Sequence, residues 1–476
     1  MRILGTVASS SREVPGAPSI GTATNVPSGR AYNNGRADVT FTAPAFDGGL
    51  PITSYTVTSS PGGFATTGAS SPLSVTGLQS STSYTFTVVA TNSRGNSAAS
   101  AASNSITATT VPQAPTIGTA ATTTSTTATV TYTAGATGGA AVSAYTATSS
   151  PGGQTGTGTS PITVSGLTTG TAYTFTVTAT NANGVSTASA ASNSVTPAPA
   201  KPSSVDYLVI AGGGGVNSTG QSTGGGGAGG YLASSIAVTG GSSYTVTVGA
   251  GSDGTSNGSN SVFSSVTAIG GGRLQVVNPG SVVTAASGGS GAGNYSAPAG
   301  SGTSGQGNAG GTGNSNPGSG GAGGGGGAGG AGGTGTTTSP GPVATGGNGG
   351  AGAASSINGT SVGRAGGGGG GAFINYGGTL VPGTGSSGGG PAGSNTAPGN
   401  TLAIKSGTAN TGGGGGGNGG FSGTYVSNGG SGIVIIAYPD SFAALTSISG
   451  GLSYTQPTRS GYRVYQFTGG TGTVTI

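Results

Sequence analysis

The 476-residue sequence contains no cysteine, no histidine and no tryptophan. Without cysteine, the chain has no disulfides, no thiolate metal sites and no cysteine nucleophile. The additional lack of histidine removes the usual protein ligands of zinc and of redox-active metals. We therefore expect the protein to use no cofactor and no metal ion.

Charged residues are scarce, at 4% of the chain against about 25% in ordinary soluble domains. A glycosidase that uses two catalytic carboxylates needs them about 5–10 Å apart. Asp206 and Asp253 are the only same-domain pair that merits this test, and no acidic residue belongs to a paired motif. The glycine-rich loops also lack the Lys-Ser/Thr ending of a phosphate loop. We therefore expect no enzymatic activity.

The net charge of +5 comes from scattered basic residues that form no basic run. This pattern predicts no nucleic-acid binding. No segment approaches the roughly 20 apolar residues of a membrane-spanning helix. Residues 1–9 contain too short an apolar patch for a secretory signal, which needs roughly 7–15 apolar residues. We expect synthesis in a cytoplasm without a signal peptide.

Residues 14–198 contain an internal repeat. ITSYTVTSSPGG at 52–63 recurs as VSAYTATSSPGG at 142–153, and YTFTVVATN at 84–92 recurs as YTFTVTATN at 173–181. Within each copy, apolar residues alternate with threonine, which indicates half-buried strands. Such strands, separated by turns with Pro-Gly-Gly and Asn-x-x-Gly, predict an antiparallel sandwich of about 90 residues per copy.

The repeat resembles the fibronectin type III family. Leu78 and Tyr84, and in the second copy Leu167 and Tyr173, match the tyrosine corner and strand F of that family. The usual core tryptophan is missing, and Val39-Phe41 and Val130-Tyr132 stand in its place. The resemblance implies a spacer or binding module and does not identify a ligand.

The rest of the chain is organised around two apolar segments, VDYLVIA at 205–211 and GIVIIAY at 432–438. Neither alternates between apolar and polar residues, which is typical of buried central strands. We predict that they are neighbours in one sheet. Between them glycine dominates, with unbroken runs of six at 366–371 and 412–417.

Three interpretations compete for residues 211–431. Collagen fails because glycine occupies all three frames in residues 320–330 and proline is rare. A disordered linker and a packed array of polyproline-II-like glycine helices remain. Such a helix has three residues per turn and no internal hydrogen bonds, so its backbone can bond to neighbouring helices. The strand-like segments at 231–238, 244–249 and 261–269 favour the ordered array.

This region resembles the glycine-rich domain of bacteriophage tail-fibre and tail-tip adhesins. The resemblance is carried by VDYLVIAGGGG at 205–215, GGGGAGGY at 224–231, YTVTVGAG at 244–251 and GGSGIVII at 429–436. It implies a sandwich of glycine helices whose connecting loops contact a receptor. Residues 461–476 look like a hairpin, with its sheet partner left open.

Islands of other residues interrupt the glycine runs and are the candidates for binding. Aromatic side chains in loops supply contact area at low entropic cost, and cations add orientation. The alternative for the aromatic residues is that they fill the core between sheet and glycine runs. The candidate receptor-binding residues are Arg273, Tyr295, Arg364, Phe373, Tyr376 and Lys405.

We predict an all-β chain of five segments. In order, these are an N-terminal attachment segment (1–13), two tandem fibronectin type III-like sandwiches (14–111 and 112–199), a glycine-rich domain (200–438) with flanking strands and packed polyglycine helices, and a C-terminal β-hairpin segment (439–476).

The function that we predict is that of a virion structural protein, located in the phage tail. As a tail fibre or adhesin, it would bind a host surface receptor, either a glycan or an outer-membrane protein, without a covalent bond. Its N-terminal part would attach to other tail or baseplate proteins. The sequence does not distinguish between a homotrimer and a monomeric tip. The alternative function is a bacterial cell-surface or extracellular-matrix adhesion protein.

Overall fold

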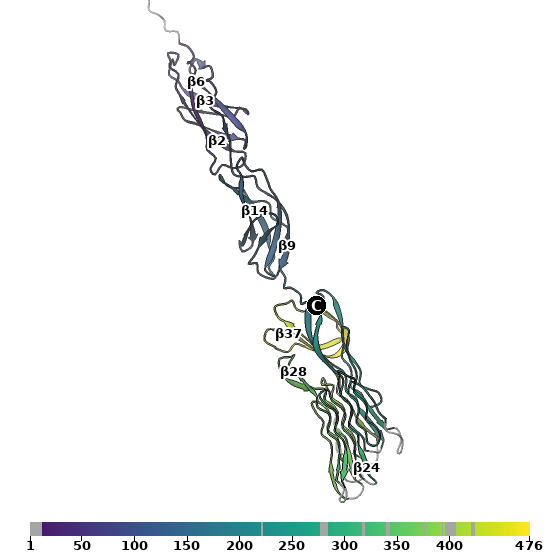
Figure 1. Cartoon of the computed structure of the whole chain (residues 1–476). Coiled ribbons are helices and arrows are strands. Elements are labelled where there is room, and N and C mark those ends of the chain that lie inside the picture. Colours follow the sequence, from purple (N-terminus) through teal and green to yellow (C-terminus); the bar gives the residue numbers. More distant parts are fainter. Residues whose placement is uncertain are drawn as a thin grey trace, which may run out of the picture. The chain divides into compact units, whose positions relative to one another are not determined.

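The computed structural model describes residues 12–219, 222–276, 284–316, 319–338, 343–374, 377–392, 394–395, 406–419 and 424–476. Their regular secondary structure consists of strands, and none of these residues forms a helix (Figure 1). The predicted all-β fold class is therefore confirmed. Accordingly, no helix capable of spanning a membrane occurs in the described residues. The chain divides into two compact units, Met1–Pro199 and Ala200–Ile476.

The first unit contains two sandwiches, each made of two sheets. In both, apolar residues alternate along the strands, so one face of each sheet enters a shared core. In the first sandwich β1 (Ser19–Asn25), β2 (Gly35–Thr42) and β5 (Leu73–Leu78) form one sheet, and β3 (Ser54–Ser60), β4 (Ala65–Gly68), β6 (Ser83–Asn92), β7 (Gly95–Asn96) and β8 (Ile106–Thr107) form the other.

The second sandwich repeats this arrangement, as the internal sequence repeat predicts. Aromatic pairs stand where the family's tryptophan is missing: Phe41 packs on Tyr55, with ring centroids 4.7 Å apart, and Tyr132 on Tyr145, at 4.6 Å. One sheet contains β9 (Thr116–Thr124), β10 (Thr127–Thr133) and β13 (Ile162–Val164), and the other contains β11 (Val142–Ser150), β12 (Thr155–Thr157), β14 (Thr174–Asn181) and β15 (Gly184–Val185).

Both expected tyrosine corners are present. The buried Tyr84 hydroxyl accepts a hydrogen bond from the Gln79 amide at 2.9 Å, and the buried Tyr173 hydroxyl accepts one from the Thr168 amide at 3.0 Å. A buried phenol is more stable when its hydroxyl has a hydrogen-bond partner. These two bonds confirm the family-based expectation at both positions.

A serine ladder closes one edge of each sandwich. In the first, Ser97, Ser100 and Ser103 occur at every third residue, and each contacts one alternate residue of β6. For example, the Ser100 amide donates to the Val88 carbonyl at 2.9 Å, while the Ser100 hydroxyl accepts from the Val88 amide at 3.0 Å. Side-chain hydroxyls thus satisfy strand amides that a regular neighbouring strand would otherwise bind. The second sandwich repeats the ladder with Ser186, Ser189 and Ser192.

The second unit is built on a nine-stranded sheet. Strand β16 pairs with β34 in antiparallel register, with Leu208 opposite Ile435, which confirms the prediction that these segments are neighbours. Its strands are β16 (Ser204–Ile210), β18 (Tyr231–Ala237), β19 (Ser243–Thr247), β20 (Ser261–Phe263), β21 (Val266–Ala268), β34 (Ile433–Pro439), β35 (Ser447–Ile448), β36 (Leu452–Thr455) and β37 (Tyr462–Thr475).

Both faces of this sheet are covered at residues 208–210 and 433–437, which explains the apolar sequence of these parts of β16 and β34. Val209 and Val434 pack in a cluster with Phe263, whereas Leu208 and Ile435 pack in another cluster that contains Ala228 and Ala365 of the glycine-rich region. A strand covered on both faces has no solvent-facing position for a polar residue.

The C-terminal residues differ from the prediction. Residues 461–476 do not form a hairpin by themselves, because nearly all of them belong to the single 14-residue strand β37. One part of β37 pairs with β34 and the other with β19, so this strand joins the two halves of the sheet. Strand β36 precedes it and pairs with its middle.

Beyond the large sheet, several short strands border the glycine runs (Figure 1). They contain two to four residues each and belong to four small sheets. These sheets are β17 (Val216–Thr219), β22 (Leu274–Val276), β23 (Thr284–Ala285) and β33 (Thr424–Ser427); β24 (Asn314–Asn316), β25 (Ser319–Gly321), β30 (Ala372–Ile374) and β32 (Ser394–Asn395); β26 (Thr336–Thr338), β27 (Val343–Thr345) and β31 (Thr379–Val381); and β28 (Ala353–Ser355) with β29 (Val362–Arg364).

The glycine runs bond to one another through their backbones, with a period of three residues. Successive amides of residues 225–230 donate hydrogen bonds to three neighbouring segments in turn. The fourth amide donates to the first of these segments again. Because each of these six amides has a partner in another segment, residues 225–230 need no hydrogen bonds among themselves. The acceptors, in order, are Gly323, Gly415, Gly272, Gly326, Gly412 and Ile269.

Close approach of the runs explains why they consist of glycine. A Cβ atom built on Gly225 would collide with the carbonyl of Gly368, and one on Gly368 would collide with the carbonyl of Gly415. Both obstacles are backbone atoms, which cannot swing aside as a side chain can. The interior of the array therefore excludes side chains at these positions.

Candidate binding site

The six predicted receptor-binding residues do not form one site. Arg273 lies between a glycine run and β22, where it is half-buried. Its guanidinium donates to the Thr255 carbonyl at 2.7 Å and also contacts the Gln275 side chain. Tyr376 and Lys405 lie outside the described residues.

Tyr295 and Phe373 are brought together, with ring centroids 5.6 Å apart. Both are half-buried, and a Cβ atom on Gly320 of β25 would collide with each of them. The two rings therefore cover the backbone of a short sheet, as the core-filling alternative for Phe373 anticipates. Receptor contact by this pair stays a prediction.

Arg364, at the end of β29, is 4% exposed. One of its terminal nitrogens, Nη1, is buried and has no hydrogen-bond partner in the part of the chain that the structure describes. Burial lowers the pKa of Arg364, because removal from water disfavours the charged form. Receptor contact by Arg364 would require this side chain to become exposed.

Two grooves that sequence reasoning missed lie over the nine-stranded sheet. The larger, about 460 Å³, is bounded by the edge of β18, by β16 and by the turn after β28; we call it the Asp206 groove. Its functional side chains come from segments far apart in the chain. Its lining residues are Asp206, Tyr207, Tyr231, Ala233, Ser234, Ser235, Ala354, Ser355, Ser356, Ile357 and Arg459.

The charged groups of the Asp206 groove are held by neutral partners. The Asp206 carboxylate accepts a hydrogen bond from the Ser235 hydroxyl at 2.5 Å. The Arg459 guanidinium lies 3.6 Å from the centre of the Tyr462 ring and donates to the Ile357 carbonyl at 3.2 Å. Stacking and one hydrogen bond thus orient Arg459 without an acidic partner.

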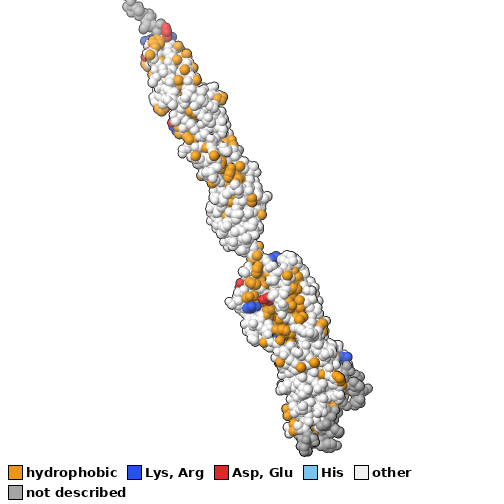
Figure 2. Space-filling model, viewed as in Figure 1, with side chains coloured by type: hydrophobic (Ala, Val, Ile, Leu, Met, Phe, Trp, Pro, Cys, Tyr) orange, Lys and Arg blue, Asp and Glu red, His pale blue; other side chains and the backbone are white. Residues whose placement is uncertain are grey.

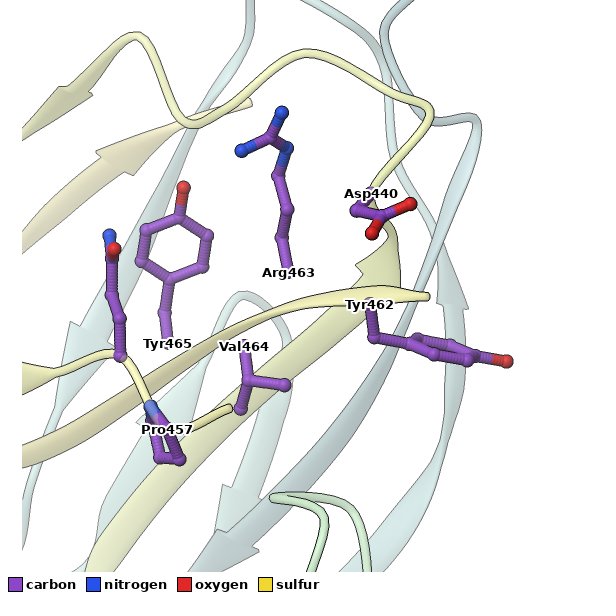
Figure 3. Close-up of a pocket in the computed structure, with 7 residues that line it drawn as sticks. Asp440, Pro457, Tyr462, Arg463, Val464 and Tyr465 are labelled. Atoms are coloured by element: carbon purple, nitrogen blue, oxygen red, sulfur yellow. The ribbon is translucent and has the colours of Figure 1, made fainter. Parts of the chain in front are cut away.

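The second groove, about 280 Å³, is lined by Asp440, Gln456, Pro457, Tyr462, Arg463, Val464 and Tyr465; we call it the Arg463 groove. Figure 3 shows Arg463 and Tyr465 extending in the same direction from β37, whereas Tyr462 points away from them. Arg463 Nε donates to the Phe442 carbonyl at 2.9 Å, and the Tyr465 hydroxyl accepts from the Leu445 amide at 3.2 Å.

Under the Arg463 groove, Tyr438 stacks on Tyr465 with ring centroids 6.1 Å apart. Tyr438 is 1% exposed, and its hydroxyl has no hydrogen-bond partner among the described residues. Burial, first of all, and the neighbouring Tyr465 raise the pKa of Tyr438. Tyr438 thus supports Tyr465, which lines the groove, from the buried side.

The two grooves contain several charged side chains, although the chain has few charged residues. Only six acidic and 11 basic residues occur in the sequence, yet Asp206, Asp440, Arg459 and Arg463 all line these two grooves. Figure 2 shows how sparse charged side chains are on the viewed face. In the described part of the chain no group of acidic side chains could hold a metal ion.

Comparison with known families identifies the second unit. A glycine-rich domain family matches residues 187–439, which is more than half of the 476 residues. The chain belongs to this glycine-rich domain family. Two further matches, at 24–106 and 113–195, identify the sandwiches as fibronectin type III domains. Domains of this type suggest a structural or adhesion-type protein.

Among solved structures, the glycine-rich protein is similar to the crystal structure of the FN1–FN3 domains of chicken CNTN1. The sequences are 16% identical, and the similarity covers 39% of this chain and 68% of the CNTN1 chain with a TM-score of 0.20. No curated protein matches the glycine-rich protein.

Proposed function

We propose that the protein is a tail fibre or tail-tip adhesin of a bacteriophage, which binds a host surface receptor without a covalent bond. The observation that carries the proposal is the backbone-bonded glycine array. Its interior excludes side chains, so recognition chemistry is confined to its borders and to the segments that connect the runs. A stiff body that presents side chains only at its borders is suited to display binding segments.

We infer that the glycine runs are polyproline-II-like helices. Support comes from residues 225–230, where every third amide donates its hydrogen bond to the same neighbouring segment. A helix with three residues per turn points successive amides in three directions and repeats at the fourth. This geometry would stiffen the array in three directions at once, because the run at 225–230 is bonded to three neighbouring segments.

The motifs at 205–215 and 429–436 support the phage assignment by their resemblance to tail adhesins. In this proposal the fibronectin type III domains act as spacers, and the N-terminal part binds other tail or baseplate proteins. Residues 1–11 lie outside the described residues. The protein would be made in the host cytoplasm, would reside in the virion tail and would have no enzymatic activity.

The experiment that tests this function is immunogold electron microscopy of the source culture, with antibody raised against residues 200–476. Gold on the tails of phage particles is the expected result. Gold on cell envelopes together with bare virions would contradict it and would favour the bacterial surface-protein alternative. Preimmune serum on the same grids is the control.

Receptor binding is tested separately by competition for adsorption. Pre-incubation of host cells with the purified full chain should slow adsorption of the phage. A chain that carries Arg273→Ala and Tyr295→Ala should compete less well if the predicted residues contact the receptor. Equal competition by this variant and the parent chain would show that neither residue contributes to receptor binding.

A further inference from the structure

The Asp206 groove retains unused hydrogen-bonding capacity on both of its charged groups. A carboxylate has about four acceptor positions and a guanidinium has five donors. The only hydrogen bond to Asp206 in the described residues comes from Ser235, and Arg459 makes one to Ile357 there. The two side chains make no ion pair with each other among the described residues, where Arg36–Asp38 is the salt bridge found. A ligand could therefore bind to both groups without breaking an existing pair.

The aromatic side of the groove is held in place by the protein itself. The Tyr231 hydroxyl donates to the Ala354 carbonyl at 3.3 Å, which connects β18 to β28. The Tyr207 side chain points to the opposite face of the sheet, where its ring packs on Phe263 with centroids 6.3 Å apart. Tyr231 is half-buried, so it offers part of its ring surface to the groove. Rigid rings lose little conformational entropy when a ligand packs on them.

These features define the chemistry of the ligand. One negative and one positive group cancel, so the groove does not select a charged ligand by its overall field. Its acceptors, donors and serine hydroxyls favour a ligand that both donates and accepts at closely spaced positions, as hydroxyl groups do. The Tyr231 ring favours a ligand that also has an apolar C–H face. A volume of about 460 Å³ lies within the range of small-ligand sites.

A saccharide combines closely spaced hydroxyls with apolar ring faces. We propose that the Asp206 groove binds a neutral saccharide, with Asp206 accepting from sugar hydroxyls and Arg459 donating to them. Tyr231 provides the surface on which the sugar ring packs. The biological role of this groove rests on the proposed receptor-binding function, of which it would be a second contact beside the connecting segments of the glycine array.

The test uses the purified full-length chain and an array of bacterial polysaccharides of known neutral or acidic composition. Neutral polysaccharides should bind the parent chain. Asp206→Asn, which preserves shape but removes the charged acceptor, should weaken binding roughly tenfold, as expected for loss of a charge-assisted hydrogen bond. Arg459→Gln should also weaken binding. Because Arg459 supports the turn after β28, thermal unfolding of both variants is measured alongside.

Asp253→Asn is the matched control. Asp253 is an exposed acid of the same unit that accepts a hydrogen bond from the Thr255 amide at 2.9 Å and does not line the groove. This variant should bind like the parent chain. Unchanged binding by Asp206→Asn would overturn the proposal. It would also be overturned by binding to acidic polysaccharides alone, or by no binding to either class.

This outcome is separable from that of the adhesin proposal. Gold on phage tails together with full polysaccharide binding by Asp206→Asn would contradict the saccharide site and support the adhesin proposal. Gold on cell envelopes together with loss of binding in Asp206→Asn would keep the saccharide site and remove the phage assignment.

Discussion

The Gly368 amide donates to the Gly226 carbonyl at 3.1 Å, and the two residues belong to different runs of the glycine array. The same Gly226 donates through its amide to the Gly415 carbonyl at 2.8 Å, so three runs meet around one residue. Each bond contributes only about 1 kcal/mol net. The array is stable because such bonds occur at nearly every residue of every run.

Gly368→Ala should disrupt the glycine array. Its Cβ would collide with the Gly415 carbonyl, and neither backbone can move without breaking lateral bonds. We expect a loss of about 3 kcal/mol or more in the free energy of unfolding of the second unit. Thermal unfolding combined with limited proteolysis measures this loss. Gly450→Ala is the control, because its Cβ would meet nothing within 4 Å; equal stability of the two variants would contradict the packing argument.

Ser100→Ala should weaken the first sandwich at its edge. The substitution removes the hydroxyl that accepts from the Val88 amide at 3.0 Å and leaves that buried amide without this partner. We expect a loss of about 1–3 kcal/mol in the free energy of unfolding. Ser189→Ala should have the same effect on the second sandwich, where the Ser189 hydroxyl accepts a hydrogen bond from the Val177 amide. Chemical denaturation of both variants, with the exposed Ser93→Ala as control, checks this ladder.

Tyr173→Phe should lower the stability of the second sandwich. It removes the hydroxyl that accepts from the Thr168 amide at 3.0 Å while it keeps the buried ring. The unsatisfied amide should cost about 1–3 kcal/mol. Tyr145→Phe in the same sandwich is the control, because its half-buried ring packs on Tyr132. If urea midpoints fall equally in both variants, the corner hydrogen bond is not what stabilises this region.

Acid should destabilise the first sandwich through Asp38. The Arg36 side chain, first of all, and Ser74 donate to this carboxylate and hold the pKa of Asp38 below its ordinary value. Because the folded pKa is the lower one, the stabilisation is present above the unfolded value of about 4 and is lost as pH falls through the folded value. Asp38→Asn should remove this part of the pH dependence.

The second sandwich provides an internal comparison for the acid effect. Thr129 pairs with Thr163 there, as Asp38 pairs with Ser74 in the first sandwich, so no carboxylate occupies that position. Hydrogen exchange below about pH 4 should increase more in β2 than in β10. Equal increases in both strands would show that Asp38 is not responsible.

The sandwiches were predictable because their determinants are local. Alternating apolar residues, the positions of Tyr84 and Tyr173, and the repeat itself are all visible in short stretches of sequence. The pairing of β16 with β34 was also predictable, because two unbroken apolar segments need the same buried environment. The sequence did not, however, indicate the exchange of serine hydroxyls along the sandwich edges, since Ser97, Ser100 and Ser103 resemble any small polar stretch.

Strand β37 and the two grooves could not be predicted for a different physical reason. Gly469 and Gly470 look like a turn, but here a positive φ of 91° at Gly470 occurs inside a continuing strand. The grooves depend on contacts between segments far apart in the chain, such as Arg459 with Ile357. The burial of Arg364, one of the six candidate residues, could not be predicted either, because it depends on segments that the local sequence does not show.

Strand β37 makes the second unit dependent on residues that are translated after all the other strands of its sheet. It pairs with β34 on one side and β19 on the other, so a ribosome that has made everything before residue 462 has not yet supplied the strand between them. Phe467 and Val474, which are fully buried in the sheet, would still be missing at that stage. A prematurely terminated polypeptide would therefore expose the apolar edges of β34 and β19, which would make truncated products targets for proteolysis.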